Sequence, residues 1–241
     1  LECCERAEIY LDTLELALTK IKIFKDQEKF NKCMNLIDYY LLKFPENQKI
    51  KLLQAEIYRR QFNFQKAIKI YESLLLKDNN IDLICWTAEC HNLSENYSQA
   101  YQYFLKAVEI SPENPTLLNN YGVCLNRLSQ YEKSLDIFSR ALQIDDKRSE
   151  LYLNRALVYK NMGDYKKYNN DNHIAYQMNP DCPKINLNYS ISKFLEKRYH
   201  SAWKHYEYRI FDKESVHYSQ TGIVPPSLVI SHHLPRSAYR G

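Results

Sequence analysis

The sequence contains few of the residues that make tight turns. It has 4 glycines and 8 prolines among its 241 residues. Because tight β-turns rely on these two residues, their scarcity argues against a protein built from short strands. Hydrophobic residues make up 45% and charged residues 26% of the chain, which is ordinary for a soluble protein that buries a core. We therefore expect a helical protein.

Signals for membranes and secretion are also missing. No window of about 18 uncharged apolar residues exists that could span a membrane, so we expect no membrane partner. The first ten residues, LECCERAEIY, carry three acids where a signal peptide has an apolar core. The first residue is Leu rather than Met, which leads us to expect a fragment or a processed product.

Cysteine spacing and charge exclude two further classes. The seven cysteines include no CxxC pair and no matching histidine spacing for zinc, so we expect a reduced, cytoplasmic setting and no cofactor. The net charge of +4 comes without runs of Lys and Arg. Such a mild charge does not favour nucleic acid as a partner.

A repeat of 34 residues organises the chain. Its marker is an aromatic residue that recurs at intervals of 34, 33, 34, 34 and 34 residues. This aromatic column comprises Phe30, Phe64, Tyr97, Tyr131, Tyr165 and Tyr199. Nine residues earlier a small side chain stands in five of the six units. Small or apolar residues also recur three, seven and ten positions after the aromatic, which is one face of a helix.

The ends of the helices can be placed from the same period. Pro45, Pro112 and Pro180 stand fifteen residues after the aromatic, where a helix must stop before the next begins. A turn is expected earlier in each unit, as in LSQY at 128–131 and MGDY at 162–165. Gly163 suits the left-handed end of a helix there. Each unit is therefore predicted to be two helices joined by a short turn.

By this spacing the chain resembles the tetratricopeptide repeat (TPR) family. The pattern is best kept in LLNNYGVCLNRLSQYEKSLDIFSRALQIDD (117–146) and LYLNRALVYKNMGDY (151–165). The resemblance covers residues 14 to about 211 and implies an all-α, right-handed superhelical solenoid of antiparallel helix pairs. Local packing is in doubt at repeats one and five, where the pattern is broken. The departures are Ile21, Cys33, Tyr40, Tyr168 and Asn172.

The resemblance gives a domain plan. Residues 1–13 are expected to be a partial leading helix, the second of a repeat whose first half is missing, and 212–241 an irregular tail. Arg209 takes a column that is otherwise small or apolar, so the stack should stop there. We expect the tail to be flexible, to fold back on the last repeat, or to be the stub of a truncated domain. The predicted repeats are 14–47, 48–80, 81–114, 115–148, 149–182 and 183–211.

In this family the first helix of each repeat lines the inner groove, and one groove column stands out. It reads Thr19, Leu53, Trp86, Asn120, Asn154 and Asn188. A carboxamide has an acceptor and two donors, so it can hold both the N–H and the C=O of an extended peptide. The three asparagines are similar to the asparagine ladder of O-GlcNAc transferases. Alternatively, they only bond neighbouring backbone.

Basic residues give the groove a second candidate role. Arg59, Arg60, Arg127 and Lys160 are expected near the groove, where they suit an acidic peptide or its C-terminal carboxylate. The carboxylate-clamp signature of chaperone-binding TPR proteins is missing. These charges are alternatively an ordinary solvated face.

No catalytic constellation is recognisable in the sequence. It has no GxSxG, HExxH, P-loop or GxGxxG motif. His232 and His233 are adjacent, so their side chains point apart, and no acidic partner lies at metal-ligand spacing. We therefore expect neither an enzyme site nor a metal.

The leading hypothesis is a protein-binding module that holds a partner peptide in the groove. The alternative is the substrate-recognition region of a glycosyltransferase whose catalytic domain is absent or truncated. It rests on AWKHYEYR at 202–209, which looks like the end of the TPR region in bacterial proteins of that kind, through Trp203, Tyr206, Glu207 and Arg209. A scaffold that only spaces other proteins is the third hypothesis.

Overall fold

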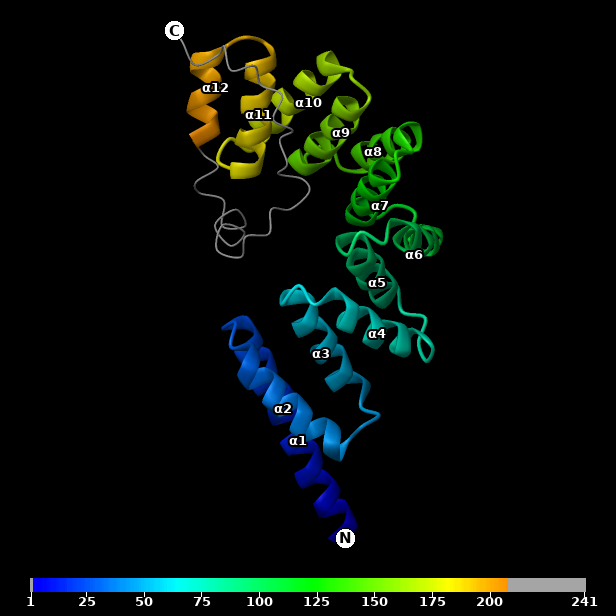
Figure 1. Cartoon of the computed structure of the whole chain (residues 1–241). Coiled ribbons are helices and arrows are strands. Elements are labelled where there is room, and N and C mark those ends of the chain that lie inside the picture. Colours follow the sequence, from blue (N-terminus) through cyan, green and yellow to red (C-terminus); the bar gives the residue numbers. More distant parts are fainter. Residues whose placement is uncertain (1, 208–241) are drawn as a thin grey trace. The chain divides into compact units, whose positions relative to one another are not determined.

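The computed structural model describes the backbone of residues 2–207 and the side chains of residues 14–207. Twelve helices and no strand occur in residues 2–207 (Figure 1), so the predicted all-α class is confirmed. The helices are α1 (Glu2–Asp26), α2 (Phe30–Lys43), α3 (Gln48–Arg60), α4 (Phe64–Leu75), α5 (Ile81–Leu93), α6 (Tyr97–Ile110), α7 (Pro115–Arg127), α8 (Tyr131–Ile144), α9 (Ser149–Asn161), α10 (Tyr165–Met178), α11 (Pro183–Leu195) and α12 (Tyr199–Tyr206).

The helices contact one another in consecutive pairs. Each odd-numbered helix packs against the even-numbered helix that follows it. Neighbouring pairs also contact one another through α2 with α3, α4 with α5, α6 with α7, and α10 with α11. The contacts divide the chain into two compact units, residues 1–144 with α1–α8 and residues 145–241 with α9–α12. We call these the first and second units.

The leading helix differs from the prediction. Residues 2–13 do not form a separate partial helix, because α1 continues unbroken from Glu2 to Asp26. The stretch contains no glycine or proline that would end a helix. The helix therefore runs through the predicted boundary at residue 13.

The turn inside each pair has one backbone design. One residue per turn takes a positive φ, and the next N–H donates to a carbonyl five residues back, as from Asn96 to His91 (2.8 Å) and from Asp164 to Tyr159 (2.9 Å). This is the Schellman ending of a helix. Within residues 2–207, Gly163 is the only glycine at positive φ. The positive-φ positions are Glu28, Phe62, Glu95, Ser129, Gly163 and Lys197.

Asparagine and proline set the ends of the helices between pairs. The side chains of Asn47, Asn80 and Asn114 accept hydrogen bonds from the first turns of α3, α5 and α7. Pro45, Pro112 and Pro180 lie just past the last residues of α2, α6 and α10, as predicted.

The small column allows close helix packing. A Cβ added to Gly122 on α7 would lie 2.8 Å from the ring of Phe138 on α8, a side chain that is fully buried. Ala55, Ala88 and Ala156 are likewise fully buried. The predicted packing role of this column is confirmed at these positions.

In repeat five the large and small side chains of the second helix stand in exchanged columns. Tyr168 stands where Ala67, Ala100 and Ser134 stand in earlier repeats, and Asn172 stands in the column of Phe138. Both are buried. The Tyr168 hydroxyl donates to the Asn188 carbonyl (3.2 Å), and the Asn172 amide donates to the Tyr168 carbonyl (2.9 Å). In repeat five the large side chain, Tyr168, therefore stands one helical turn earlier than Phe138 does in repeat four, and the smaller Asn172 stands in the column of Phe138.

Candidate functional site

Two pairs of successive first helices contact one another. In the first unit α1 contacts α3, and α5 contacts α7. The groove predicted from the sequence would lie on these first helices. Trp86 and Asn120 are half-buried on this surface, whereas Leu53 is buried in the core with 6% of its surface exposed.

Asn120 is held by side chains of its own unit. Its amide nitrogen donates to Glu89 Oε1 (2.8 Å), and its oxygen accepts from the amide of Asn119 (3.4 Å). The oxygen has a second lone pair and the nitrogen a second N–H. The orientation of this carboxamide is therefore fixed before any ligand binds.

The other two asparagines lie in the second unit. Asn154 is half-buried on α9. Asn188 on α11 donates to the Lys184 carbonyl one turn earlier (2.9 Å). For Asn188 the structure therefore shows the neighbouring-backbone bond that was the alternative to ligand binding. Asn154 and Asn188 lie in the same unit, on successive first helices.

Charged pairs connect successive first helices of the first unit. Lys25 on α1 pairs with Glu56 on α3. Arg59 on α3 pairs with Glu89 on α5 (3.4 Å), and Glu89 in turn accepts from Asn120 on α7. The repeat columns did not predict this row of Lys25, Glu56, Arg59, Glu89 and Asn120. Its signal was present, because the partners stand 30 or 31 residues apart, about one turn short of a full repeat.

These ion pairs reduce the positive charge that the predicted basic residues offer to a ligand. Arg59 is neutralised by Glu89, and Arg60 lies 4.0 Å from Asp26 and donates to the Lys25 carbonyl (3.5 Å). Arg127 on α7 and Lys160 on α9 are exposed. The structure brings Arg59, Glu89 and Asn120 together, and it places Lys160 in the other unit.

Glu89 is the electrostatic centre of the row. Burial raises the pKa of its carboxyl, while Arg59 and the hydrogen bond from Asn120 act in the opposite direction. About a quarter of the side chain, 28%, is exposed. Glu89 is thus a partly desolvated carboxylate that holds one residue from each neighbouring first helix.

A hollow of about 230 Å³ lies between α3 and α5, in front of Trp86. We call it the Trp86 hollow. The Trp86 ring packs against Tyr71 with 5.9 Å between ring centroids. The lining residues are Gln48, Lys49, Leu52, Leu74, Asp78, Asn80, Asp82, Leu83 and Trp86.

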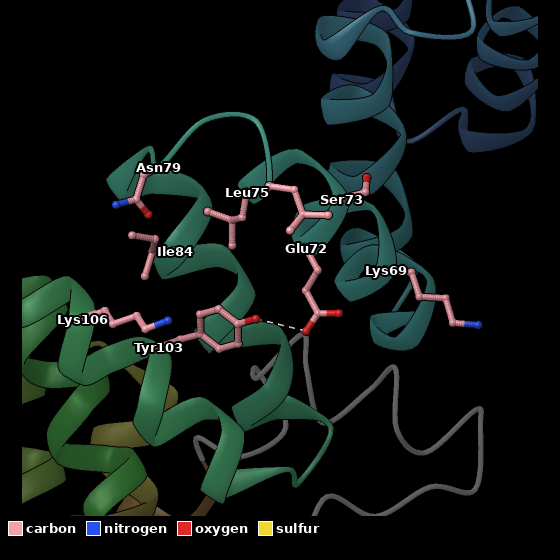
Figure 2. A pocket seen from close by; sticks show the side chains of 9 residues that line it. Lys69, Glu72, Ser73, Leu75, Asn79, Ile84, Tyr103 and Lys106 are labelled. Atoms are coloured by element: carbon pink, nitrogen blue, oxygen red, sulfur yellow. Dashed lines mark hydrogen bonds between the residues drawn. The ribbon is translucent and has the colours of Figure 1, made fainter.

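A larger hollow of about 520 Å³ lies on α4 and α6, the second helices of their pairs (Figure 2). Glu72 Oε1 accepts from the Tyr103 hydroxyl (3.2 Å) and lies 3.3 Å from His91 Nε2. The His91 ring stacks on Tyr103 with centroids 5.5 Å apart. In Figure 2, Lys69 points away from the hollow. The Glu72 carboxylate therefore already serves to hold α5 and α6 against α4.

Thiol chemistry is suppressed in this part of the fold. Burial raises the pKa of Cys90 and of Cys124 to about 12, and that of Cys85 to about 11. No group of three or more potential metal ligands occurs among the residues that the structure describes. None of the helices described is long and apolar enough to cross a membrane.

The end of the repeat region is seen only in part. Trp203 on α12 contacts Phe194 on α11 edge-on, with centroids 5.3 Å apart, and Tyr206 packs beside it at 5.5 Å. Trp203 remains 45% exposed. The predictions for Arg209, for His232 and His233, and for the tail at 212–241 fall outside the described residues.

Comparison with known proteins supports the architecture. The family model for subunit 3 of the anaphase-promoting complex (cyclosome) matches residues 60–141, and the tetratricopeptide repeat model matches residues 149–167. No curated protein matches the sequence.

Several solved structures share the fold. A tetratricopeptide repeat protein from Parabacteroides merdae has a TM-score of 0.69 and 19% identity, over 82% of this chain and 78% of that one. PilF of Pseudomonas aeruginosa has a TM-score of 0.64 and 13% identity, over 86% of this chain and 96% of PilF. YrrB, described as a TPR protein with an unusual peptide-binding site, has a TM-score of 0.59 and 16% identity, over 70% of this chain and 88% of YrrB.

The helix pairs, their Schellman turns and their close contacts through small residues define a helical repeat protein. The tetratricopeptide repeat model matches residues 149–167, and the chain shares its fold with a solved tetratricopeptide repeat protein.

Proposed function

We propose that this protein is an interaction module that binds an extended peptide of a partner protein on the inner surface of its first unit. The observation that carries the proposal is the row formed by Arg59, Glu89 and Asn120. It joins three successive first helices and leaves a half-buried carboxamide on the surface.

The state of Asn120 supports an extended ligand. Glu89 holds one N–H of the carboxamide, so the second N–H and a lone pair of the oxygen keep a fixed direction. A fixed donor and acceptor match the C=O and N–H of a peptide without reading its side chains. Little side-chain freedom remains to be lost on binding, which favours affinity.

The peptide-binding surface in this proposal has a definite composition. In the first unit it consists of Trp86, Asn120, Arg59 and Arg60, with Arg127 at the end of α7. Asn154, Asn188 and Lys160 form the corresponding surface of the second unit. A peptide-binding site in YrrB, which has the same fold, supports this assignment.

The basic residues of the groove give little support to an acidic partner. Arg59 and Arg60 already face Glu89 and Asp26. Only Arg127 and Lys160 of the predicted basic set remain as exposed positive charges without an ion pair described above. Exposed charges of this kind contribute about 0–1 kcal/mol each.

A binding experiment tests the proposal. The purified chain is screened against a library of synthetic 12-residue peptides, and the peptides that bind are titrated against the wild type, Asn120→Ala and Asn170→Ala. Asn170 is an exposed asparagine on the second helix α10 and serves as the matched control. We expect Asn120→Ala to weaken binding by roughly 1–2 kcal/mol through the lost peptide bonds and Asn170→Ala to leave it unchanged. Equal loss in both variants contradicts the role of Asn120.

The protein is proposed to act by binding and not by catalysis. Burial keeps the thiols of Cys85, Cys90 and Cys124 protonated by raising their pKa, and the Glu72 carboxylate is occupied by structural hydrogen bonds. The glycosyltransferase alternative rests on Trp203, Tyr206, Glu207 and Arg209. It stays a prediction, which sequencing of the gene beyond Gly241 tests through the presence of a transferase reading frame.

A further inference from the structure

We propose that the Trp86 hollow takes a basic side chain of the bound peptide, with arginine preferred. This inference rests on the proposed function and adds the chemistry by which the partner is chosen.

The hollow has the size and the lining of a pocket for one long side chain. Its volume of about 230 Å³ equals roughly seven or eight water molecules at about 30 Å³ each. Leu52, Leu74 and Leu83 supply apolar walls for a methylene chain, and Trp86 forms one side. An apolar wall with a few polar groups at the rim is the usual build of a ligand pocket.

Acidic groups predominate at the rim. Asp78 and Asp82 are both exposed at the hollow, and Lys49 is the one basic residue in its lining. Lys77, next to Asp78, is paired with Glu46. The local charge therefore favours a cationic group of the ligand, which is the reverse of the acidic partner expected from the sequence.

The Trp86 ring is held in place and can contact a cation with its face. Tyr71 packs on the indole at a tilt of 35° and is itself fully buried, so the ring is supported from within the protein. A guanidinium or ammonium group above an indole face is attracted by the ring electrons. Arginine suits the hollow better than lysine, because its flat guanidinium stacks on the ring and its N–H groups match a carboxylate in a fork.

Trp86, at the hollow, and Glu89, at the proposed peptide site, both lie on α5. Glu89 follows Trp86 by three residues, so the two side chains lie on one face of the helix. Glu89 in turn holds Asn120. A peptide whose backbone bonds Asn120 thus brings a nearby side chain to Trp86.

The test uses peptides from the library screen described above. Each peptide that binds is made again with its arginines replaced one at a time by citrulline, which has nearly the same shape and no charge. We expect one such replacement to weaken binding to the wild type about tenfold, and we expect this effect to shrink at high salt because the rim carboxylates are exposed.

Three variants locate the effect. Trp86→Leu and Asp78→Asn/Asp82→Asn are expected to bind the arginine and citrulline peptides within about twofold of each other, because the cation has lost its partners. Glu132→Gln/Asp136→Asn removes two exposed acidic charges from α8 and is expected to keep the tenfold preference. Circular dichroism melting checks each fold, and Asp78→Asn alone serves if the double change unfolds α5.

The outcomes separate the two proposals. Peptides that bind in an Asn120-dependent manner but show no citrulline effect overturn the basic pocket and leave the proposed function standing. A citrulline effect that persists in Trp86→Leu and in the Asp78/Asp82 variant also overturns it. If no peptide binds at all, the proposed function fails and the pocket inference fails with it.

Discussion

At the scale of single residues, the turns of the helix pairs show a recurrent backbone constraint. Six turns place a residue at positive φ, yet five of these residues are not glycine. An L-residue in this conformation costs about 1–2 kcal/mol, which glycine does not incur. The sequence indicated this constraint only at Gly163, because glycine is the residue type that marks a positive φ most clearly.

Glycine exchanges at the turns test this cost in both directions. Gly163 has φ +80 with nothing within 4 Å of an added Cβ, so Gly163→Ala should lower the unfolding free energy by about 1 kcal/mol through backbone strain alone. Glu95→Gly, at φ 64, should raise it by roughly 0.5 kcal/mol, since the gain is offset by the greater freedom of glycine when unfolded. Urea denaturation measures both, and the same sign for the two changes contradicts the account.

Glu89 gives a prediction about pH. Burial raises the pKa of its carboxyl in the folded protein. The folded state therefore binds this proton at a higher pH than the unfolded chain, whose glutamates titrate near about 4.3. The resulting stabilisation is full below the unfolded pKa and is lost as pH rises through the folded pKa. Glu89→Gln removes this titration while keeping an oxygen that accepts from Asn120.

The unfolding free energy of the wild type, relative to that of Glu89→Gln, should thus increase when pH falls from about 7 to about 5. Glu46, Asp145 and Asp164 have lowered pKa values and act in the opposite direction. They are present in both proteins, so the difference removes their effect. Urea titrations at the two pH values measure it, and a difference that decreases on acidification refutes the assignment.

At the scale of elements, Gly122 sets the distance between α7 and α8. An added Cβ would meet the Phe138 ring at 2.8 Å, and this ring is fully buried. Gly122→Ala should therefore destabilise the protein by about 1–3 kcal/mol through overpacking. A melting temperature equal to that of the wild type shows instead that the pair can separate without cost. Ser129→Ala, at an exposed turn position, is a control for general sensitivity of this pair.

Repeat five provides a second test of packing. Tyr168→Ala should cost about 3–5 kcal/mol because it leaves a cavity, and Asn172→Phe should cost about 1–3 kcal/mol because it overfills the core. The double variant restores the arrangement of the earlier repeats, so it should be more stable than the sum of the two losses by at least about 1 kcal/mol. If the two losses of stability simply add in the double variant, the side chains at 168 and 172 do not compensate for each other in volume, and the account is contradicted.

These elements show what a sequence period can and cannot predict. The 34-residue spacing predicted the helix pairs and the stops at Pro45, Pro112 and Pro180, because both follow from local rules. The single helix α1 was missed because the period gave a repeat boundary where no helix-breaking residue stands. The pairing of Arg59 with Glu89 depends on how adjacent first helices are offset, which the columns alone do not specify.

At the scale of the whole molecule, the candidate site was predicted only in part. The columns placed Trp86 and Asn120 on the first helices, and the structure agrees. They did not reveal that Asn120 is held by Glu89 or that Trp86 stands beside two aspartates. The fold provides a surface for a ligand, but the side chains around Asn120 and Trp86 determine which peptide binds there.

The most direct test of peptide binding on the first helices is photo-crosslinking of a bound library peptide. Benzoyl-phenylalanine is placed at Asn126 on the first helix α7 in one variant and at Ser139 on the second helix α8 in another. Mass spectrometry then identifies the crosslinked peptide. The account predicts a crosslink from position 126 and none from position 139; a crosslink from 139 alone would contradict it.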